Sequence, residues 1–279
     1  MKYSSYSVLM SVYHKEKPEF LIQSMDSIYN QTIKTNDFVL ICDGPLNEEL
    51  DKAIELEKEK FGDILNVVRL PENKGLGNAL RVGVEICKNE LIARMDSDDI
   101  SKRDRCEKQL RVFNENEGVS VVGGWIEEFT DTIEVINSMR VVPETNKEII
   151  EFSKFRSPFN HPTVMYKKND VLKAGNYRSD IRNTQDYYLW IDMLTKGYKG
   201  YNIQESLLWM RANSNLFKRR AGKEYLKLQI NLLNIMKERK YISNFQYIKS
   251  FTLRTLSSLA PNWLRKLMFK KVLRKQVNK

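Results

Sequence analysis

The sequence predicts an α/β fold with a mostly parallel sheet and helices on both of its faces. Four apolar runs of strand length recur at intervals of about 25 to 30 residues, and they cover Ser7–Val12, Phe38–Cys42, Asn66–Leu70 and Leu91–Met95. Amphipathic helical patterns separate these runs. Strands that alternate with helices form βαβ units, which cross over right-handedly and build a parallel sheet.

Each separating segment carries apolar residues at helical spacing. The three stripes are Phe20, Leu21, Met25 and Ile28; then Leu50, Ile54 and Phe61; then Leu76, Leu80, Val84 and Cys87. Because each stripe marks one side of a helix, we expect that side to pack on the sheet.

Beyond Gly118 the alternation becomes less regular. A helical pattern begins near residue 183 and stops at Gly197, and Thr184 or Asp186 is placed to cap its start. Asp192 falls in the middle of that helix, where we expect it to face solvent. The other elements expected in this half are strands at Val119–Gly124 and Thr163–Tyr166, a hairpin or edge segment at Ile133–Val142 and a short helix at Asn146–Phe155.

The composition favours a cytoplasmic protein with a sizeable core. The chain has 279 residues, of which 42% are hydrophobic, enough for one large domain with an appendage. Its cysteines, Cys42, Cys87 and Cys106, are far apart, as is typical of free thiols in a reducing compartment. With only His14 and His161, a histidine-based metal site is not expected. The N-terminus lacks a signal-peptide layout, and no apolar run reaches the roughly 18 residues of a membrane span.

The net charge of +10 is concentrated at the C-terminus. Residues 241–279 contain nine Lys or Arg residues and no Asp or Glu, which leaves +1 for residues 1–240. We therefore expect one domain over residues 1–222 and a basic helical extension over residues 223–279. Within residues 261–276, apolar and basic residues alternate at helical spacing, a pattern typical of a helix at a membrane surface. The alternative is a helix that packs on its own domain or on a partner.

Polar residues follow the ends of the predicted strands, which is where ligands bind in open α/β sheets. Carboxylates at two strand ends and a loop with glycine and lysine at a third fit a nucleotide bound through both its base and its phosphates. The P-loop motif is absent, and Leu80 stands where a dinucleotide fingerprint would need its third glycine. The segments after the four strands are Tyr13-His14, Asp43-Gly44-Pro45, Pro71–Gly77 and Asp96–Asp99.

The segment Asp96-Ser97-Asp98-Asp99 places three carboxylates within four residues. Close carboxylates repel one another unless a cation lies between them. Two of them, Asp96 and Asp98, would point the same way in an extended segment. A hard divalent cation suits such an oxygen-only site. The alternative is that Asp98 or Asp99 caps a helix around 103–113, but the position after a fourth regular strand favours the metal.

Several motifs in this order resemble the family 2 inverting glycosyltransferases, especially bacterial enzymes of capsular or exopolysaccharide assembly. The resemblance spans about residues 6–220 and implies a GT-A fold, a nucleotide-sugar donor that is most often UDP-linked, and Mn²⁺ or Mg²⁺. The Gln-x-x-Arg-Trp motif of processive synthases is absent, as are their membrane spans, which favours addition of a single sugar. The motifs are Ser7–Tyr13, Met25–Thr32, Asp43-Gly44, Asn73-Lys74-Gly75, Asp96–Asp99 and Gln185–Trp190.

The resemblance also implies how this chain would bind its donor. Asp43 would accept a hydrogen bond from a pyrimidine base, with Ser11 and Tyr13 lining the same pocket. Asn73 and Lys74 would lie near the ribose or the diphosphate. Each of these residues occupies the position of a family motif in this sequence.

For the transfer step, the resemblance places Asp96 near the ribose or sugar, with Asp98 as the principal metal ligand and Asp186 as the general base. A cation stabilises the leaving diphosphate, and Arg211 could add positive charge there. An acceptor hydroxyl must lose its proton as it attacks, for which one carboxylate suffices. The chain departs from the family in having Gln185 where Glu is usual.

Two other functions are compatible with parts of the sequence. A sugar nucleotidyltransferase would use paired Asp residues but would ordinarily have a glycine-rich loop after the first strand, and Tyr13–Pro18 has no glycine. A non-enzymatic nucleic-acid-binding protein could use the basic, aromatic tail, but it would have no need of carboxylates at strand ends. We therefore expect transfer of one sugar to a saccharide or lipid-linked acceptor, by an enzyme held peripherally at the inner face of the cell membrane.

Overall fold

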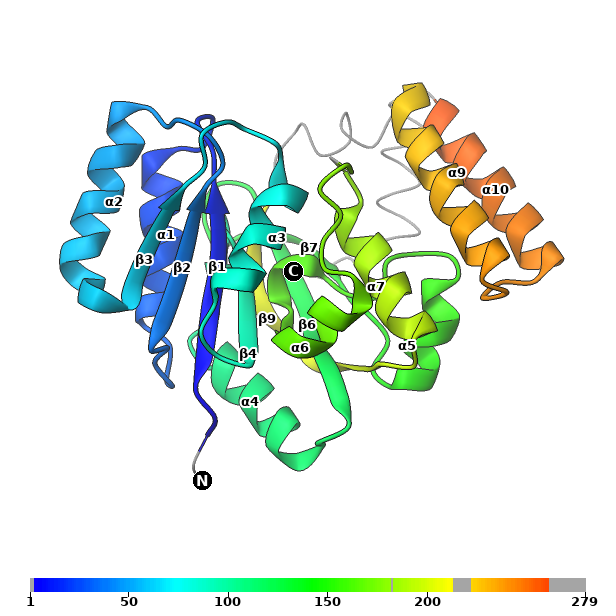
Figure 1. Ribbon diagram of the computed structural model, residues 1–279, viewed down its shortest axis with the longest axis horizontal. Coiled ribbons are helices and arrows are strands. Elements are labelled where there is room, and N and C mark those ends of the chain that lie inside the picture. Colours follow the sequence, from blue (N-terminus) through cyan, green and yellow to red (C-terminus); the bar gives the residue numbers. More distant parts are fainter. Residues whose placement is uncertain (1–2, 182, 213–221, 261–279) are drawn as a thin grey trace.

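A computed structural model describes residues 3–181, 183–212 and 222–260 of the chain (Figure 1). One sheet runs through it in the order β3-β2-β1-β4-β8-β6-β9-β5, with β7 paired to β6. The strands are β1 (Tyr6–Val12), β2 (Asp37–Cys42), β3 (Leu65–Arg69), β4 (Leu91–Asp96), β5 (Ile100–Ser101), β6 (Val119–Phe129), β7 (Ile136–Arg140), β8 (Met165–Lys167) and β9 (Lys199–Arg211).

The sheet is mostly parallel, as predicted. Strands β1 to β4 pair in parallel with one another, and β6 pairs in parallel with β9. The short β8 lies antiparallel between β4 and β6, and β5 and β7 are also antiparallel to their neighbours. All of the parallel strands therefore present their carboxyl ends at one edge of the sheet.

Helices cover both faces of this sheet (Figure 1). The bounds of the first three helices fall close to the three predicted stripes. The first six helices are α1 (Pro18–Tyr29), α2 (Glu48–Phe61), α3 (Leu76–Ile86), α4 (Arg105–Glu115), α5 (Asn146–Ser153) and α6 (Lys168–Ala174). The remainder are α7 (Gln185–Thr195), α9 (Gly222–Glu238) and α10 (Asn244–Leu259), with short 3₁₀ turns at Gly62–Ile64 and His161–Thr163.

Alternating side chains of the central strands belong to two separate cores. In β1, Val8 and Met10 pack into the core shared with α1, α2 and α4, whereas Leu9 packs into the core shared with α3, α6 and α7. This alternation is the two-residue period of a strand that is buried on both faces. The helix α3 lies so close to the sheet that a Cβ atom on Gly83 would be 2.2 Å from Leu9 Cδ1.

Local capping explains several helix starts. Asn47 accepts a hydrogen bond from the Leu50 amide at 2.8 Å at the start of α2, and Thr145 with Glu148 forms a capping box at the start of α5. These contacts satisfy backbone amides that have no partner within the helix. The capping role considered for Asp98 or Asp99 is wrong, because β5 separates both residues from α4.

Two expectations for the helix α7 are also wrong. Its N-cap residue Thr184 has a left-handed backbone and makes no capping hydrogen bond, while Asp186 lies inside the first turn. Asp192 is 6% exposed and does not face solvent. It forms ion pairs with Arg178, at 3.2 Å, and with Arg239 at the end of α9. The sequence pattern shows which side of a helix packs on the sheet. It does not show that further residues cover the other side of α7.

The helices α9 and α10 lie side by side as a hairpin at the edge of the molecule (Figure 1). The hairpin packs on α7 through an apolar cluster composed of Ile181, Tyr187, Tyr188, Ile191, Leu232, Leu233, Met236 and Ile242. The division into a domain over residues 1–222 and an extension over residues 223–279 stays a prediction. The amphipathic helix expected at 261–276 lies outside the described residues. No helix in the described ranges is long and apolar enough to cross a membrane.

A buried arginine joins this hairpin to α7. Arg254 of α10 is 8% exposed and donates hydrogen bonds to Gln229 Oε1 at 2.6 Å and to the Tyr187 hydroxyl at 3.2 Å. A further hydrogen bond reaches the Phe155 carbonyl at 3.3 Å. The guanidinium therefore connects α10, α9 and α7 in the interior.

We predict that Arg254→Met destabilises the protein by about 2–3 kcal/mol, because it leaves several buried acceptors without a donor. Thermal unfolding of the purified chain measures this change. Lys249→Met is the matched control, since Lys249 is an exposed cation on the same helix. Equal melting temperatures for the two variants would contradict the role given to Arg254.

Candidate active site

The carboxyl ends of β1, β2 and β4 bring the predicted donor-binding residues to one edge of the sheet. Ser11 of β1 is the register partner of Asp96 in β4. The amide of Asp43, the residue after β2, donates to the Val12 carbonyl at 2.8 Å. Ser11, Asp43 and Asp96 therefore follow three neighbouring strands, as the sequence predicts.

Asp43 holds the loop that precedes α3. Its carboxylate accepts hydrogen bonds from the amides of Lys74 at 3.0 Å and Gly75 at 2.9 Å, and its carbonyl accepts one from Asn73 Nδ2 at 3.0 Å. The close approach requires glycine at position 44, which has a φ of +88° and where a Cβ would lie 2.6 Å from the Asn73 amide nitrogen. Asp43 is thus fixed against the Asn73–Gly75 loop.

Two of the predicted donor-binding side chains lie at the surface of this edge. Lys74 directs its ammonium group to Glu72, with 2.9 Å between Nζ and Oε1. Tyr13 is 41% exposed and contacts the ring of His14 edge to face. Neither side chain contributes to the core, so both are available to a ligand at the strand ends.

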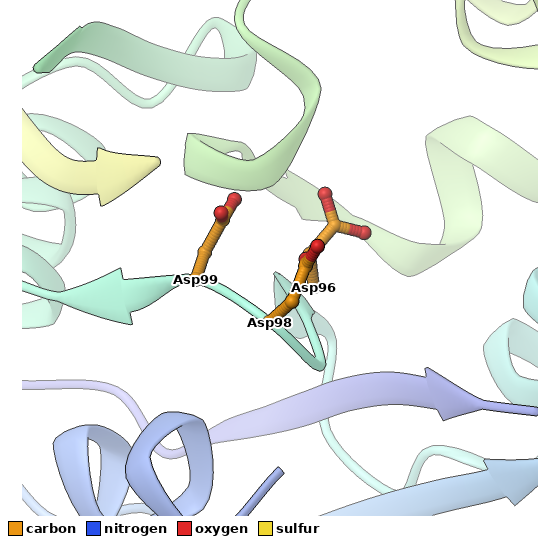
Figure 2. A group of neighbouring side chains, drawn as sticks. All are labelled: Asp96, Asp98 and Asp99. Carbon is orange, nitrogen blue, oxygen red and sulfur yellow. The ribbon is translucent and has the colours of Figure 1, made fainter. Parts of the chain in front are cut away.

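Three carboxylates converge after β4 (Figure 2). One oxygen from each of Asp96, Asp98 and Asp99 lies within 4.8 Å of the others. The predicted proximity of Asp96 and Asp98 is confirmed, but the expected reason is wrong. The strand ends at Asp96, and a turn at residues 97–98 brings the later carboxylates back toward it. Asp99, at the end of the turn, joins the same cluster.

Burial and mutual repulsion make this cluster costly when it is ionised. Burial, together with the charges of Asp96 and Glu16, raises the pKa of Asp98 to about 7. Burial and the charges of Asp98 and Asp96 raise the pKa of Asp99 well above its ordinary value. Among the described residues, Asp99 Oδ2 is a buried oxygen without a hydrogen-bond partner. A cation would favour the ionised form of these groups, so the donor set fits a hard divalent ion.

A buried arginine that the sequence analysis missed supports the cluster from below. Arg94 is 1% exposed, and its guanidinium binds both carboxylate oxygens of Asp96, one of them at 2.8 Å. A second buried arginine, Arg105, donates to the Arg94 carbonyl at 2.7 Å. The signal in the sequence is a charged residue inside an apolar strand, two positions before an aspartate on the same side of that strand.

Arg211 reaches the same turn from the end of β9. Its amide donates to Asp99 Oδ1 at 2.9 Å and its Nε donates to the Asp98 carbonyl at 3.1 Å. The guanidinium lies 3.8 Å from the ring centroid of Phe20 and 4.7 Å from that of Phe129. Arg211 thus fixes the turn that carries the acidic cluster, and its predicted role at the diphosphate stays a prediction.

Asp186 lies in the first turn of α7, where it is partly exposed. Burial raises the pKa of the Tyr177 phenol, and the charges of Asp186 and Asp96 act in the same direction. Asp186 and Asp96 therefore both lie near Tyr177, and the role of Asp186 as the general base stays a prediction.

His161 is buried in the core beside Tyr177. Its Nε2 lies 2.9 Å from the Tyr177 hydroxyl, and its ring packs edge to face against Trp190. Burial and the nearby charge of Arg94 hold the pKa of His161 well below its ordinary value, so the ring is neutral at neutral pH. This histidine supports the site from the core.

Comparison with curated proteins shows close relatives over the whole length. A β-1,3-galactosyltransferase of Escherichia coli, described as UDP-Gal:alpha-D-GlcNAc-diphosphoundecaprenol beta-1,3-galactosyltransferase, is 35% identical over 272 residues, 97% of each chain. The amylovoran biosynthesis glycosyltransferase AmsE of Erwinia amylovora is 33% identical over 271 residues, which cover 95% of this chain and 98% of that protein.

Solved structures share the fold at lower identity. Residues 1–349 of S. aureus TarS, in complex with UDP-GlcNAc, match with a TM-score of 0.70 and 14% identity over 96% of this chain and 76% of that chain. The mannosyltransferase PcManGT of Pyrobaculum calidifontis, in complex with GDP-Man and Mn²⁺, matches with a TM-score of 0.63 and 13% identity over 93% and 71% of the two chains. The expected GT-A fold is confirmed by these neighbours.

The sequence also matches the family described as Glycosyl transferase family 2 over residues 7–175. This range contains β1 to β4, the Asp43 loop and the acidic cluster. Together with the full-length relatives, it establishes that the chain belongs to glycosyl transferase family 2.

Proposed function

We propose that this glycosyltransferase moves one sugar, with inversion, from a UDP-sugar to a saccharide or lipid-linked acceptor in the assembly of a cell-surface polysaccharide. The observation that carries the proposal is the cluster of three carboxylates at the carboxyl edge of a parallel sheet. The relatives support it, because one is named for UDP-galactose transfer and another for amylovoran biosynthesis.

The donor would lie across the strand ends. Its base would contact Asp43, Ser11 and Tyr13, and its ribose or diphosphate would contact Asn73 and Lys74. TarS has been crystallised with UDP-GlcNAc on the same fold, which supports a nucleotide at this edge. Because Asp43 already orders the Asn73–Gly75 loop, the pocket would be formed before the donor binds.

Asp98 and Asp96 would hold Mn²⁺ or Mg²⁺, with Asp99 close by. Bound there, a divalent cation would offset the charge that develops on the leaving diphosphate. PcManGT, which shares the fold, has been crystallised with Mn²⁺. The role of Arg94 would be to fix Asp96, since its guanidinium is buried beneath the cluster and already binds that carboxylate.

Asp186 would remove the proton from the acceptor hydroxyl. As a first-turn residue it is held in place by its neighbours, because the Tyr187 hydroxyl donates to the Ser153 carbonyl at 2.5 Å and the Tyr188 hydroxyl donates to the Leu228 carbonyl at 3.0 Å. A base that is fixed in this way can act on a hydroxyl that approaches from the exposed side.

A lipid-linked acceptor would place the enzyme at the inner face of the cell membrane. The E. coli relative is named for an acceptor linked to diphosphoundecaprenol. The basic segment at residues 241–279 carries nine positive residues and no acidic one, which suits a surface of anionic lipid. We propose no nucleic-acid ligand for this segment.

We predict that Asp98→Asn lowers the transfer rate by about 10³-fold or more, because the leaving diphosphate loses its bound cation. A second readout is thermal unfolding, where Mn²⁺ at about 100 times its Kd should raise the melting temperature of the natural chain by roughly 5 °C. The variant should lack this rise yet remain stable without metal, since the substitution removes one charge from a crowded site.

Asp63→Asn provides the matched control, because Asp63 is exposed and precedes β3, at the edge of the sheet opposite to the cluster. This control should keep both the activity and the stabilisation by Mn²⁺. If Asp98→Asn responded to Mn²⁺ as the natural chain does, or if EDTA left transfer unchanged, the metal assignment would be wrong.

We predict that Asp186→Asn lowers the transfer rate by about 10²–10⁴-fold, the usual contribution of a general base. Donor affinity should change little, because the amide has the shape of the carboxylate. Initial rates and calorimetric binding of UDP measure the two effects separately. Asp170→Asn is the matched control, as Asp170 is also a first-turn acid, in α6. A variant that lost UDP binding instead would show that Asp186 binds the donor.

A further inference from the structure

The helix α10 has its polar side buried and its apolar side exposed. Ser250, Arg254 and Ser258 face the interior, with exposed fractions of 2%, 8% and 3%. The opposite side carries Phe245 at 76%, Ile248 at 63%, Phe251 at 38%, Leu253 at 50% and Leu256 at 61% exposure. Surface helices of soluble proteins normally have the reverse arrangement.

This exposed apolar side, hereafter the α10 face, is unlike the rest of the described surface. The other large apolar side chains that are exposed in the described residues lie singly on separate elements, and they are Tyr13, Tyr29, Leu56 and Val135. Single exposed apolar residues are ordinary, whereas a continuous patch of them marks an interaction surface.

The orientation of α10 is fixed by contacts on its polar side. Arg254 binds Gln229, Tyr187 and the Phe155 carbonyl. Ser243 and Gln246 form a capping box that sets the first turn. Rotation of the helix to bury its apolar residues would leave the Arg254 charge without these partners, at a cost of several buried hydrogen bonds. The apolar face must therefore be covered from outside.

Charge indicates what covers it. Residues 261–279 carry seven Lys or Arg residues and no acidic residue, and the exposed Lys249 of α10 is a neighbour of Ile248 in the sequence. Two copies that met through this face would bring equal positive charges together. An anionic lipid surface instead attracts the basic residues and takes up the apolar side chains.

We propose that the α10 face is a membrane-docking surface that inserts its apolar side chains among the acyl chains of an anionic bilayer. The inference rests on the proposed function, which places the enzyme at the membrane. It goes further because it assigns the membrane contact to named residues of α10. The hairpin that docks is the one that packs on α7, so docking would also orient the acidic cluster relative to the lipid.

Co-sedimentation of the full-length chain with vesicles tests this proposal. The probes are phosphatidylcholine vesicles with and without phosphatidylglycerol, at low and high salt. We expect binding to the anionic vesicles. The double variant Ile248→Gln/Leu256→Gln should lower the partition coefficient by about tenfold or more, because two exposed aliphatic side chains no longer leave water. Glutamine is a comparably good helix former, so α10 should remain helical.

The matched control is Leu56→Gln/Val135→Gln, which removes two apolar side chains of similar exposure, 61% and 56%, from other elements. This control should bind vesicles as the natural chain does. Equal binding by both double variants would overturn the proposal, as would failure of the natural chain to bind anionic vesicles.

Two other occupants would give different results. If a second copy covered the face, light scattering would show a dimer that dissociates in the α10 double variant, with no vesicle binding. If residues 261–279 covered it, the chain would be a monomer that ignores vesicles, and the α10 variant would melt at a lower temperature. Transfer to a water-soluble acceptor is measured in parallel. The α10 double variant should keep this activity, so that a loss of vesicle binding alone reports on docking. A natural chain without transfer activity would instead count against the proposed function.

Discussion

The repulsion among three carboxylates at the end of β4 is the constraint on which the rest of the site depends. The strand ends and the turn after Asp96 hold the oxygens within 4.8 Å of one another, and the interior raises the pKa of Asp98 to about 7. The surrounding contacts each reduce this cost. Arg94 binds Asp96 from below, and the Arg211 amide binds Asp99 from β9. The proposed divalent cation would reduce the same cost further, because it would favour the ionised carboxylates.

The proposed general base, which is the second requirement of transfer, comes from a different part of the chain. Asp186 lies on a helix whose first turn has no capping hydrogen bond from its own N-cap residue, Thr184. The adjacent Tyr187 is held by Ser153 and Arg254, so the position of the proposed base depends on the C-terminal hairpin. The C-terminal hairpin thus helps to hold the proposed base in place. Its α10 face is exposed on the opposite side.

Periodicity in the sequence was sufficient to predict the strands and helices of the first hundred residues and their order, but not α6 or β9. The strands at β1 to β4 and the helices between them follow from alternating apolar runs and stripes, because each element must bury one side or both. The position of Asp43, Asp96 and Asp98 at one edge also followed, since parallel strands end together. What could not be predicted depends on the second layer of packing. Arg94 was hidden in an apolar run, Asp192 is covered by Arg178 and Arg239, and the inverted α10 breaks the rule that the apolar side faces inward.

The most direct test of the central claim is calorimetric titration of UDP into the full-length chain with and without Mn²⁺. If the acidic cluster and the Asp43 pocket form one site for a metal-bound nucleotide, Mn²⁺ should lower the Kd of UDP by about tenfold or more, and UDP should lower the Kd of Mn²⁺ by the same factor, because coupling between two ligands is reciprocal. A Kd of UDP that is the same with Mn²⁺ and with EDTA would contradict the account.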